Sequence, residues 1–114
     1  MGTTVPNVER GGDVFFWKLN AEAFLGGSGI PSIIVKPCGL NDGPSGQHAL
    51  KALHDDKRGA LDPFMIARAD VAAVVKQAVV ERSSGLRFGV CNAHGPAGTD
   101  LSALLKSARW PWQQ

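Results

Sequence analysis

Apolar residues recur at helical spacing in three separate segments of the chain. In residues 13–25 the apolar positions follow Asp13, which can cap a helix, and the glycine-rich run at 26–29 is typical of a helix end. A stripe of valine and alanine predicts a second helix that starts at Asp70, whose carboxylate is expected to cap it. The third stripe predicts a helix from residue 99 or 100 to about 108.

Two short apolar segments between these helices predict strands. Residues 30–35 are mostly β-branched and apolar on both faces, which is typical of a central strand in a parallel sheet covered by helices. Residues 86–91 alternate in polarity and predict a second strand. Residues 37–47 predict a long loop, and 49–54 fit a short strand or a short helix. This order of elements indicates an α/β fold with a mostly parallel sheet flanked by helices.

A single domain accounts for the 114 residues. Residues 1–12 are polar and contain proline and glycine, so a flexible leader is expected there. Residues 110–114 are expected to form a tail, in which Trp110 and Trp112 either fold back on the core or contact a partner. No apolar run approaches the roughly 20 residues of a membrane span.

Charge and cysteine content narrow the classes of function. The 12 basic and 10 acidic residues give a net charge of +2, which is too small to indicate a nucleic acid or an anionic membrane as partner. Cys38 and Cys91 lack metal-ligand spacing, so free thiols in a reducing compartment are expected, in the cytoplasm or an organelle stroma such as that of a plastid. The histidines share no spacing with other ligand residues, so no metal site is expected.

Four groups of residues carry a resemblance to a known family. In their order and spacing the chain resembles the C-terminal half of the short-chain dehydrogenase/reductase superfamily, and is most similar to its atypical, NmrA-like, NAD(P)-binding members. The resemblance implies a partial Rossmann-like fold that lacks the N-terminal glycine-rich βαβ half, with residues 13–109 as the C-terminal half of an NAD(P)-binding domain. The matching groups are residues 17–22, 28–30, 34–40 and 67–72.

The resemblance implies cofactor contacts in two parts of the chain. In complete members of the superfamily a Tyr-x-x-x-Lys motif opens this helix, and its lysine binds the nicotinamide ribose and lowers the pKa of the tyrosine for proton transfer. The tyrosine position falls on Val14, which cannot transfer a proton, so no catalytic residue is assigned. The segment after the strand corresponds to backbone beside the nicotinamide amide. The implied cofactor-binding residues are Lys18, Pro37, Cys38, Gly39 and Leu40.

These residues also have plain structural explanations. Lys18 fits a solvated charge on a helix surface, and an ion pair with Glu22, four residues later, accounts for both side chains. Cys38 fits a small buried residue as well as a reactive thiol. The Arg68 side chain can be explained as a solvated surface charge. It could also pair with a carboxylate or bind a phosphate group.

The function that the resemblance implies is NAD(P) binding, with NAD(P)-dependent oxidoreductase activity if an N-terminal half completes the fold. The glycine run at 26–29 follows a helix and precedes a strand, which is the reverse of a phosphate-binding loop, so weak or absent binding is expected from this chain alone. The alternatives are a non-catalytic dinucleotide-sensing, regulatory or assembly module, and an inactive truncated homologue. The expected partner is a dinucleotide or small molecule, and an exposed sheet edge would favour homo-oligomers.

Overall fold

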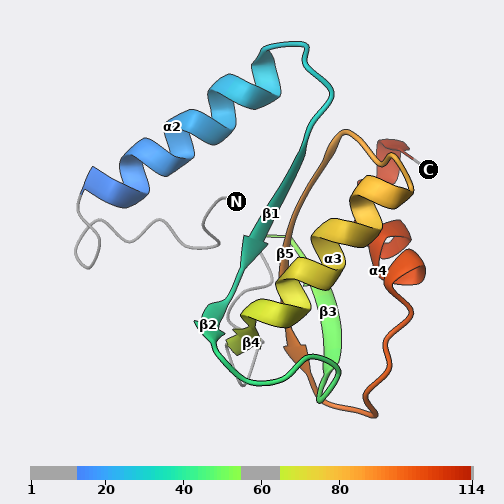
Figure 1. Ribbon diagram of the computed structural model, residues 1–114. Helices are drawn as coiled ribbons and strands as arrows, with labels where there is room; N and C mark the ends of the chain where they lie inside the picture. Colours follow the sequence, from blue (N-terminus) through green and yellow to red (C-terminus); the bar gives the residue numbers. More distant parts are fainter. Residues whose placement is uncertain (1–12, 55–64, 114) are drawn as a thin grey trace.

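The computed structural model describes residues 13–54 and 65–113, and the leader expected at 1–12 lies outside these ranges. Figure 1 shows that the short strands β1 to β4 follow one another between the helices α2 and α3. In chain order they are α2 (Asp13–Gly27), β1 (Ile33–Pro37), β2 (Gly39–Asn41), β3 (Ala49–Leu53), β4 (Met65–Ala67), α3 (Arg68–Val80), β5 (Leu86–Ala93), α4 (Leu101–Ser107) and the 3-10 helix η2 (Pro111–Gln113).

The main sheet is built around β5. Strand β1 pairs with it in parallel, with Ile33 opposite Leu86, and β3 pairs with its other edge in antiparallel orientation. A second, two-stranded sheet joins β2 and β4 in parallel. The α/β prediction with mostly parallel strands is therefore confirmed, and the arrangement is that of a partial Rossmann-like fold.

One face of the main sheet forms the core together with α3 and α4. These two helices pack against each other, α3 also lies against β1, and α4 lies against β3. The predicted stripe of α3 is correct for its inner positions, but Val75 and Val79 are exposed. The principal core residues are Val35, Leu53, Ile66, Val71, Val74, Ala78, Leu86, Phe88, Val90, Leu104, Leu105 and Ala108.

The structure corrects several predicted element boundaries. Strand β1 begins at Ile33 and not at residue 30, because its pairing with β5 starts there. The predicted loop at 37–47 contains β2, and the ambiguous stretch at 49–54 contains β3. The last helix is confirmed: Asp100 caps it by accepting hydrogen bonds from the backbone N–H groups of Ser102 and Ala103.

The expected capping role of Asp70 is wrong. Helix α3 begins at Arg68, two residues before Asp70, and has no side-chain cap. Instead the buried Asp70 carboxylate anchors the segment that follows β2. Its Oδ1 accepts hydrogen bonds from the Ser45 hydroxyl at 3.0 Å and the Gly46 amide at 2.9 Å. The helix therefore holds a neighbouring loop in place through this residue.

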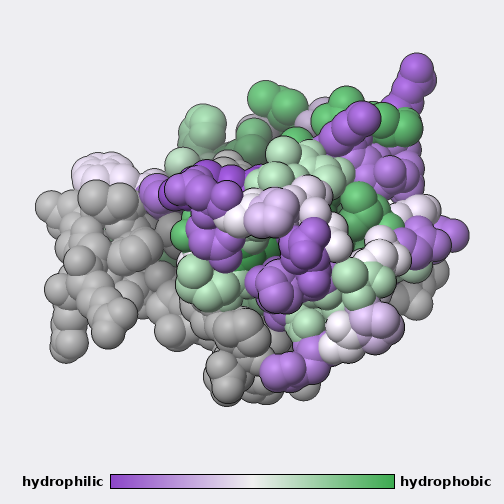
Figure 2. All heavy atoms as spheres, turned by 60° about the horizontal axis from the view of Figure 1, so that its bottom comes forward, coloured by the Kyte–Doolittle hydropathy of each residue, from purple (hydrophilic) through white to green (hydrophobic). Residues whose placement is uncertain are grey.

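Helix α2 extends away from the main sheet (Figure 1). It ends at Gly27, as the glycine run predicted, and Gly29 takes a positive φ of 80° that favours glycine. Large apolar side chains on α2 remain in solvent: Trp17 is 65% exposed and Phe24 is 81% exposed. On the face shown in Figure 2, hydrophobic and hydrophilic residues are interspersed. In the described part of the chain, no helix is both long and apolar enough to cross a bilayer.

Residues 110–113 fold back on the domain, which is one of the two arrangements that the sequence left open. The Trp110 ring stacks on His54 at a centroid distance of 3.6 Å, and Trp112 stacks on Trp110 at 5.1 Å. The Gln113 side-chain amide donates a hydrogen bond to the Gly85 carbonyl at 2.7 Å. The tail thus packs beside the start of β5.

Candidate functional site

The segment at residues 37–40 crosses the carboxyl edge of the parallel strands β1 and β5. Pro37 ends β1, and the Cys38 amide continues the pairing by donating a hydrogen bond to the Val90 carbonyl at 3.1 Å. Gly39 then opens β2. Pro37 and Gly39 are partly buried, and Leu40 is exposed. Ligands of open α/β sheets bind outside this kind of edge.

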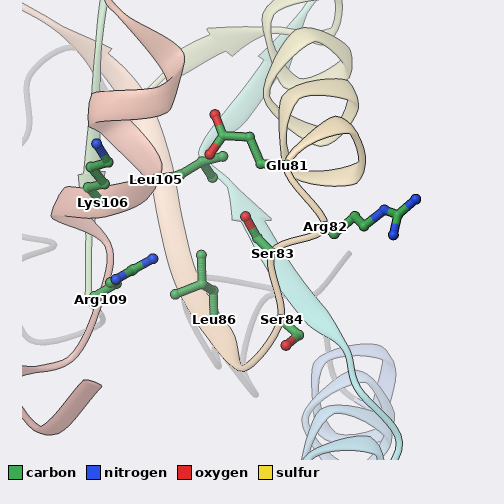
Figure 3. Close-up of a pocket in the computed structure, with 8 residues that line it drawn as sticks. All are labelled: Glu81, Arg82, Ser83, Ser84, Leu86, Leu105, Lys106 and Arg109. Carbon is green, nitrogen blue, oxygen red and sulfur yellow. The ribbon is translucent and has the colours of Figure 1, made fainter. Parts of the chain in front are cut away.

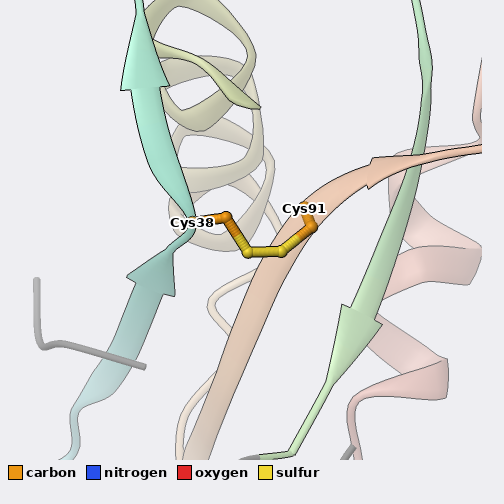
Figure 4. The surroundings of a disulfide bond; sticks show 2 residues. All are labelled: Cys38 and Cys91. Atoms are coloured by element: carbon orange, nitrogen blue, oxygen red, sulfur yellow. A yellow bond between two sulfur atoms is a disulfide. The ribbon is translucent and has the colours of Figure 1, made fainter. Parts of the chain in front are cut away.

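The two cysteines form a disulfide, so the expectation of free thiols is wrong. Cys38 and Cys91 are joined across the two strands, with their Cα atoms 5.3 Å apart (Figure 4). Both residues are buried. The thiolate of a bonded cysteine is not available as a nucleophile, so the reactive-thiol explanation of Cys38 does not hold in this state. The bond instead fixes the start of the segment at 37–40 to the central strand.

Lys18 lies on the exposed surface of α2, beside the exposed Trp17. The expected ion pair between Lys18 and Glu22 is wrong. Within the described residues the Glu22 carboxylate pairs with two cations of the sheet instead: its Oε2 lies 3.3 Å from Lys36 Nζ and 3.1 Å from Arg87 Nε. The Lys18 ammonium therefore remains accessible to solvent or to a ligand.

The pairing of Glu22 with Lys36 ties α2 to the sheet. Lys36 is completely buried and Glu22 is 7% exposed, so both charges lie away from water. A charge at such depth requires an opposite charge and hydrogen bonds. The signal for this buried pair in the sequence is a lysine, Lys36, inside an otherwise apolar strand. Arg68, by contrast, pairs at 2.6 Å with the exposed Asp42 on the surface.

The residues present suit the nicotinamide side of a dinucleotide better than its phosphates. An accessible ammonium can donate hydrogen bonds to ribose hydroxyls, and the 37–40 segment offers backbone at the carboxyl edge of a parallel sheet. The glycine run, however, only ends α2: the Ser28 amide donates to the Leu25 carbonyl, closing the last turn. A phosphate-binding loop would instead connect a strand to a helix N-terminus.

A polar hollow of about 300 Å³ lies at the opposite end of β5, between the ends of α3 and α4 (Figure 3). The Arg109 side chain points into it, whereas Arg82 points away. Hydrogen bonds from Gln77 and Ser102, with the nearby Lys106 cation, hold the pKa of the exposed Glu81 carboxyl below its ordinary value of 4.5. No group of three metal-ligating side chains occurs within the described residues.

Comparison with known proteins matches one family, and the similar relatives include the following two. The family described as NAD(P)H-binding matches residues 3–82, most of the chain. Sanguinarine reductase of Eschscholzia californica is 31% identical over 105 residues, which cover 89% of this chain and 38% of the relative. An uncharacterized chloroplastic protein of Arabidopsis thaliana is 40% identical over 67 residues, covering 59% of this chain and 21% of the relative. The chain thus spans well under half the length of these relatives.

Proposed function

The chain belongs to the NAD(P)H-binding family, and from this premise we propose that it is an oxidoreductase-like protein of the atypical, NmrA-like short-chain dehydrogenase/reductase type. The observation that carries the proposal is that the family match at 3–82 includes both Lys18 and the segment at 37–40. The parallel pairing of β1 with β5 supports it, because dinucleotides bind at the carboxyl edge of such strands.

In this proposal the chain supplies the nicotinamide side of the cofactor site. Lys18 donates hydrogen bonds to the nicotinamide ribose hydroxyls, and the backbone of Pro37, Cys38, Gly39 and Leu40 lies against the nicotinamide amide. The disulfide at Cys38 supports this role, since it holds the segment rigidly on the central strand. When bound, the cofactor supplies a hydride, and the protein supplies position and electrostatics.

Hydride transfer also requires a proton at the substrate. The chain contains no tyrosine, and Val14 stands at the tyrosine position of the family motif. In this proposal the proton donor is water or a group outside this chain, and oxidoreductase activity requires that an N-terminal half supplies the contacts to the cofactor phosphates. The reductase name of one relative supports a reductive activity for the completed protein, and the chloroplastic relative supports a plastid location.

The second candidate function is non-catalytic: the protein binds the dinucleotide but transfers no hydride. Val14 favours it, because a site without its proton donor can still hold the cofactor through Lys18 and the strand edge. Both functions predict cofactor binding, and they differ only in turnover.

Fluorescence titration with NADPH and NADH tests the shared claim. Trp17 is adjacent to Lys18 and 65% exposed, so its emission should be quenched on binding, and a Trp17→Phe variant identifies its share of the signal. Lys18→Ala should abolish saturable quenching. Lys76→Ala, an exposed lysine on α3, is the matched control and should bind like the unaltered protein. Saturable binding that the two variants share equally would overturn the proposed role of Lys18, and absence of saturable binding at millimolar cofactor would favour the inactive truncated homologue.

A separate assay distinguishes enzyme from binding module. Quinone and carbonyl compounds are added with NADPH, and cofactor oxidation is followed by absorbance. Turnover that Lys18→Ala removes supports the oxidoreductase, whereas cofactor binding without any turnover supports the non-catalytic module.

A further inference from the structure

The Cys38–Cys91 disulfide joins the proposed cofactor segment to the centre of the main sheet (Figure 4). Cys38 lies in the segment at 37–40, and Cys91 lies on β5, the strand that pairs with both β1 and β3. The chain contains no other cysteine, so no second disulfide can take over this link. A change in its redox state therefore acts first at the edge of the sheet where the nicotinamide is proposed to bind.

Few other contacts hold this segment among the described residues. The Cys38 amide donates one hydrogen bond to the Val90 carbonyl at 3.1 Å. Strand β2, which follows, pairs with β4 over only three residues, and its central residue Leu40 is 37% exposed. A short ladder with little buried apolar surface opens locally at low cost. The disulfide is thus a principal restraint on the backbone at 37–40.

Reduction changes the packing at the same place. Cys38 is 4% exposed and Cys91 is 0% exposed, so both sulfurs lie in the protein interior. Two thiols need more room than one disulfide, because atoms that are not bonded stay at van der Waals distance. Extra volume in a closely packed interior displaces side chains or backbone. Cys91 is held by strands on both sides, so the displacement falls on Cys38 and its segment.

We propose that this cysteine pair is a redox switch for dinucleotide affinity. The disulfide holds the segment at 37–40 in its binding position, and the reduced protein binds NAD(P) more weakly by about fivefold or more, which is a typical coupling between two sites. The inference rests on the proposed function, since it requires that this segment contacts the nicotinamide amide. Coupling is reciprocal, so bound cofactor makes the disulfide harder to reduce by the same factor.

The reductant is a dithiol, which opens the bond in two steps. Its thiolate attacks the sulfur of Cys38, the less buried of the two, and forms a mixed disulfide, while Cys91 leaves as a thiolate and takes a proton from water. The second thiolate of the reductant then attacks its own sulfur in the mixed disulfide and releases Cys38, which is protonated in turn. Two electrons pass to the protein, and the reductant becomes a disulfide.

Titration of NADPH into the oxidised chain and the dithiothreitol-reduced chain tests the switch, with Trp17 fluorescence as the signal. Reduction should raise the Kd about fivefold or more. The double variant Cys38→Ala with Cys91→Ala is the control, and its affinity should not respond to the dithiol. Equal affinities in the two redox states of the unaltered chain would overturn the switch and leave the proposed function standing. Absence of saturable binding to the oxidised chain would overturn both.

Far-ultraviolet circular dichroism shows whether the reduced chain stays folded. Unfolding on reduction would also overturn the proposal, because a switch requires two folded states.

The reciprocal effect is measured in the unaltered protein and does not depend on any variant. The chain is equilibrated in mixtures of reduced and oxidised dithiothreitol, without NADPH or with enough to saturate both redox states, and its free thiols are alkylated and counted by mass spectrometry. NADPH should raise the ratio of reduced to oxidised dithiothreitol at half-reduction by the same factor as the change in Kd. A midpoint that NADPH leaves unchanged would contradict the coupling.

Discussion

Cys38 lies directly across from Cys91 in the continuation of the β1–β5 register. Ile33 pairs with Leu86 and Pro37 with Val90, an offset of 53 residues at both ends (86 − 33 and 90 − 37). The disulfide has the same sequence separation of 53. The strand pairing therefore brings the two cysteines together, and the bond holds the edge of the sheet that follows β1.

Reduction of this disulfide should lower the free energy of unfolding by about 4 kcal/mol, because the bond closes a loop of 53 residues in the unfolded chain. Urea unfolding with and without a dithiol measures the difference. The double variant Cys38→Ala with Cys91→Ala is the control and should be insensitive to the dithiol. Equal stability of the oxidised and reduced protein would show that the bond does not form in solution.

Removal of the Glu22 charge should destabilise the protein strongly. Glu22→Gln removes a carboxylate that lies 3.3 Å from the buried Lys36 ammonium, and removing one member of a buried ion pair costs about 3 kcal/mol or more. The matched control is Asp42→Asn, the same change of acid to amide in an exposed pair with Arg68, which should cost less than about 1 kcal/mol. Urea denaturation compares the two variants, and similar losses would contradict the burial of the first pair.

Truncation of the buried Phe88 should lower the free energy of unfolding far more than truncation of an exposed phenylalanine. Phe88 is 1% exposed on the central strand, so Phe88→Ala should cost about 3–5 kcal/mol in the free energy of unfolding. Phe24 is 81% exposed on α2, and Phe24→Ala should change stability by less than about 0.5 kcal/mol. Thermal unfolding of the two variants provides the measurement, and a large loss from Phe24→Ala would place α2 in a packed environment.

Glu81 should contribute a pH-dependent stability. Its pKa is lowered in the folded protein, chiefly by the hydrogen bond from Gln77, so its contribution is present above the ordinary value of 4.5 and is lost as the pH falls through the lower folded pKa. The stability difference between the unaltered protein and Glu81→Gln should therefore shrink on acidification below 4.5. Urea unfolding between neutral pH and about pH 3 measures it, and a difference that is constant with pH would contradict the lowered pKa.

The sequence predicted those helices and strands that have a regular pattern of apolar residues or a residue that clearly marks their end. The glycine run stops α2 at Gly27, and Asp100 caps α4, because both effects act within a few residues. An apolar β-branched run predicted β1 and alternating polarity predicted β5, and their parallel order follows from the helix between them. Strands β2 and β4 were missed because each has only three residues and gains its hydrogen bonds from a segment far along the chain.

The contacts of the candidate site depend on relations that local patterns do not contain. The disulfide forms because β1 pairs with β5 in a particular register. The residues next to each cysteine in the sequence do not indicate this pairing. Glu22 has Lys18 four residues before it on the helix, yet it binds the buried Lys36, because a buried cation needs a carboxylate far more than a solvated one does. The assignments of Lys18 and the segment at 37–40 come from family resemblance, and the cofactor titration tests them.

The three stacked rings at the carboxyl terminus provide a native spectroscopic label. Because the Trp110 and Trp112 indoles are held in fixed, nearly parallel planes 5.1 Å apart, they should give a near-ultraviolet circular dichroism band that is lost when the tail leaves the domain. That band reports whether the last residues are docked against His54, without any added dye.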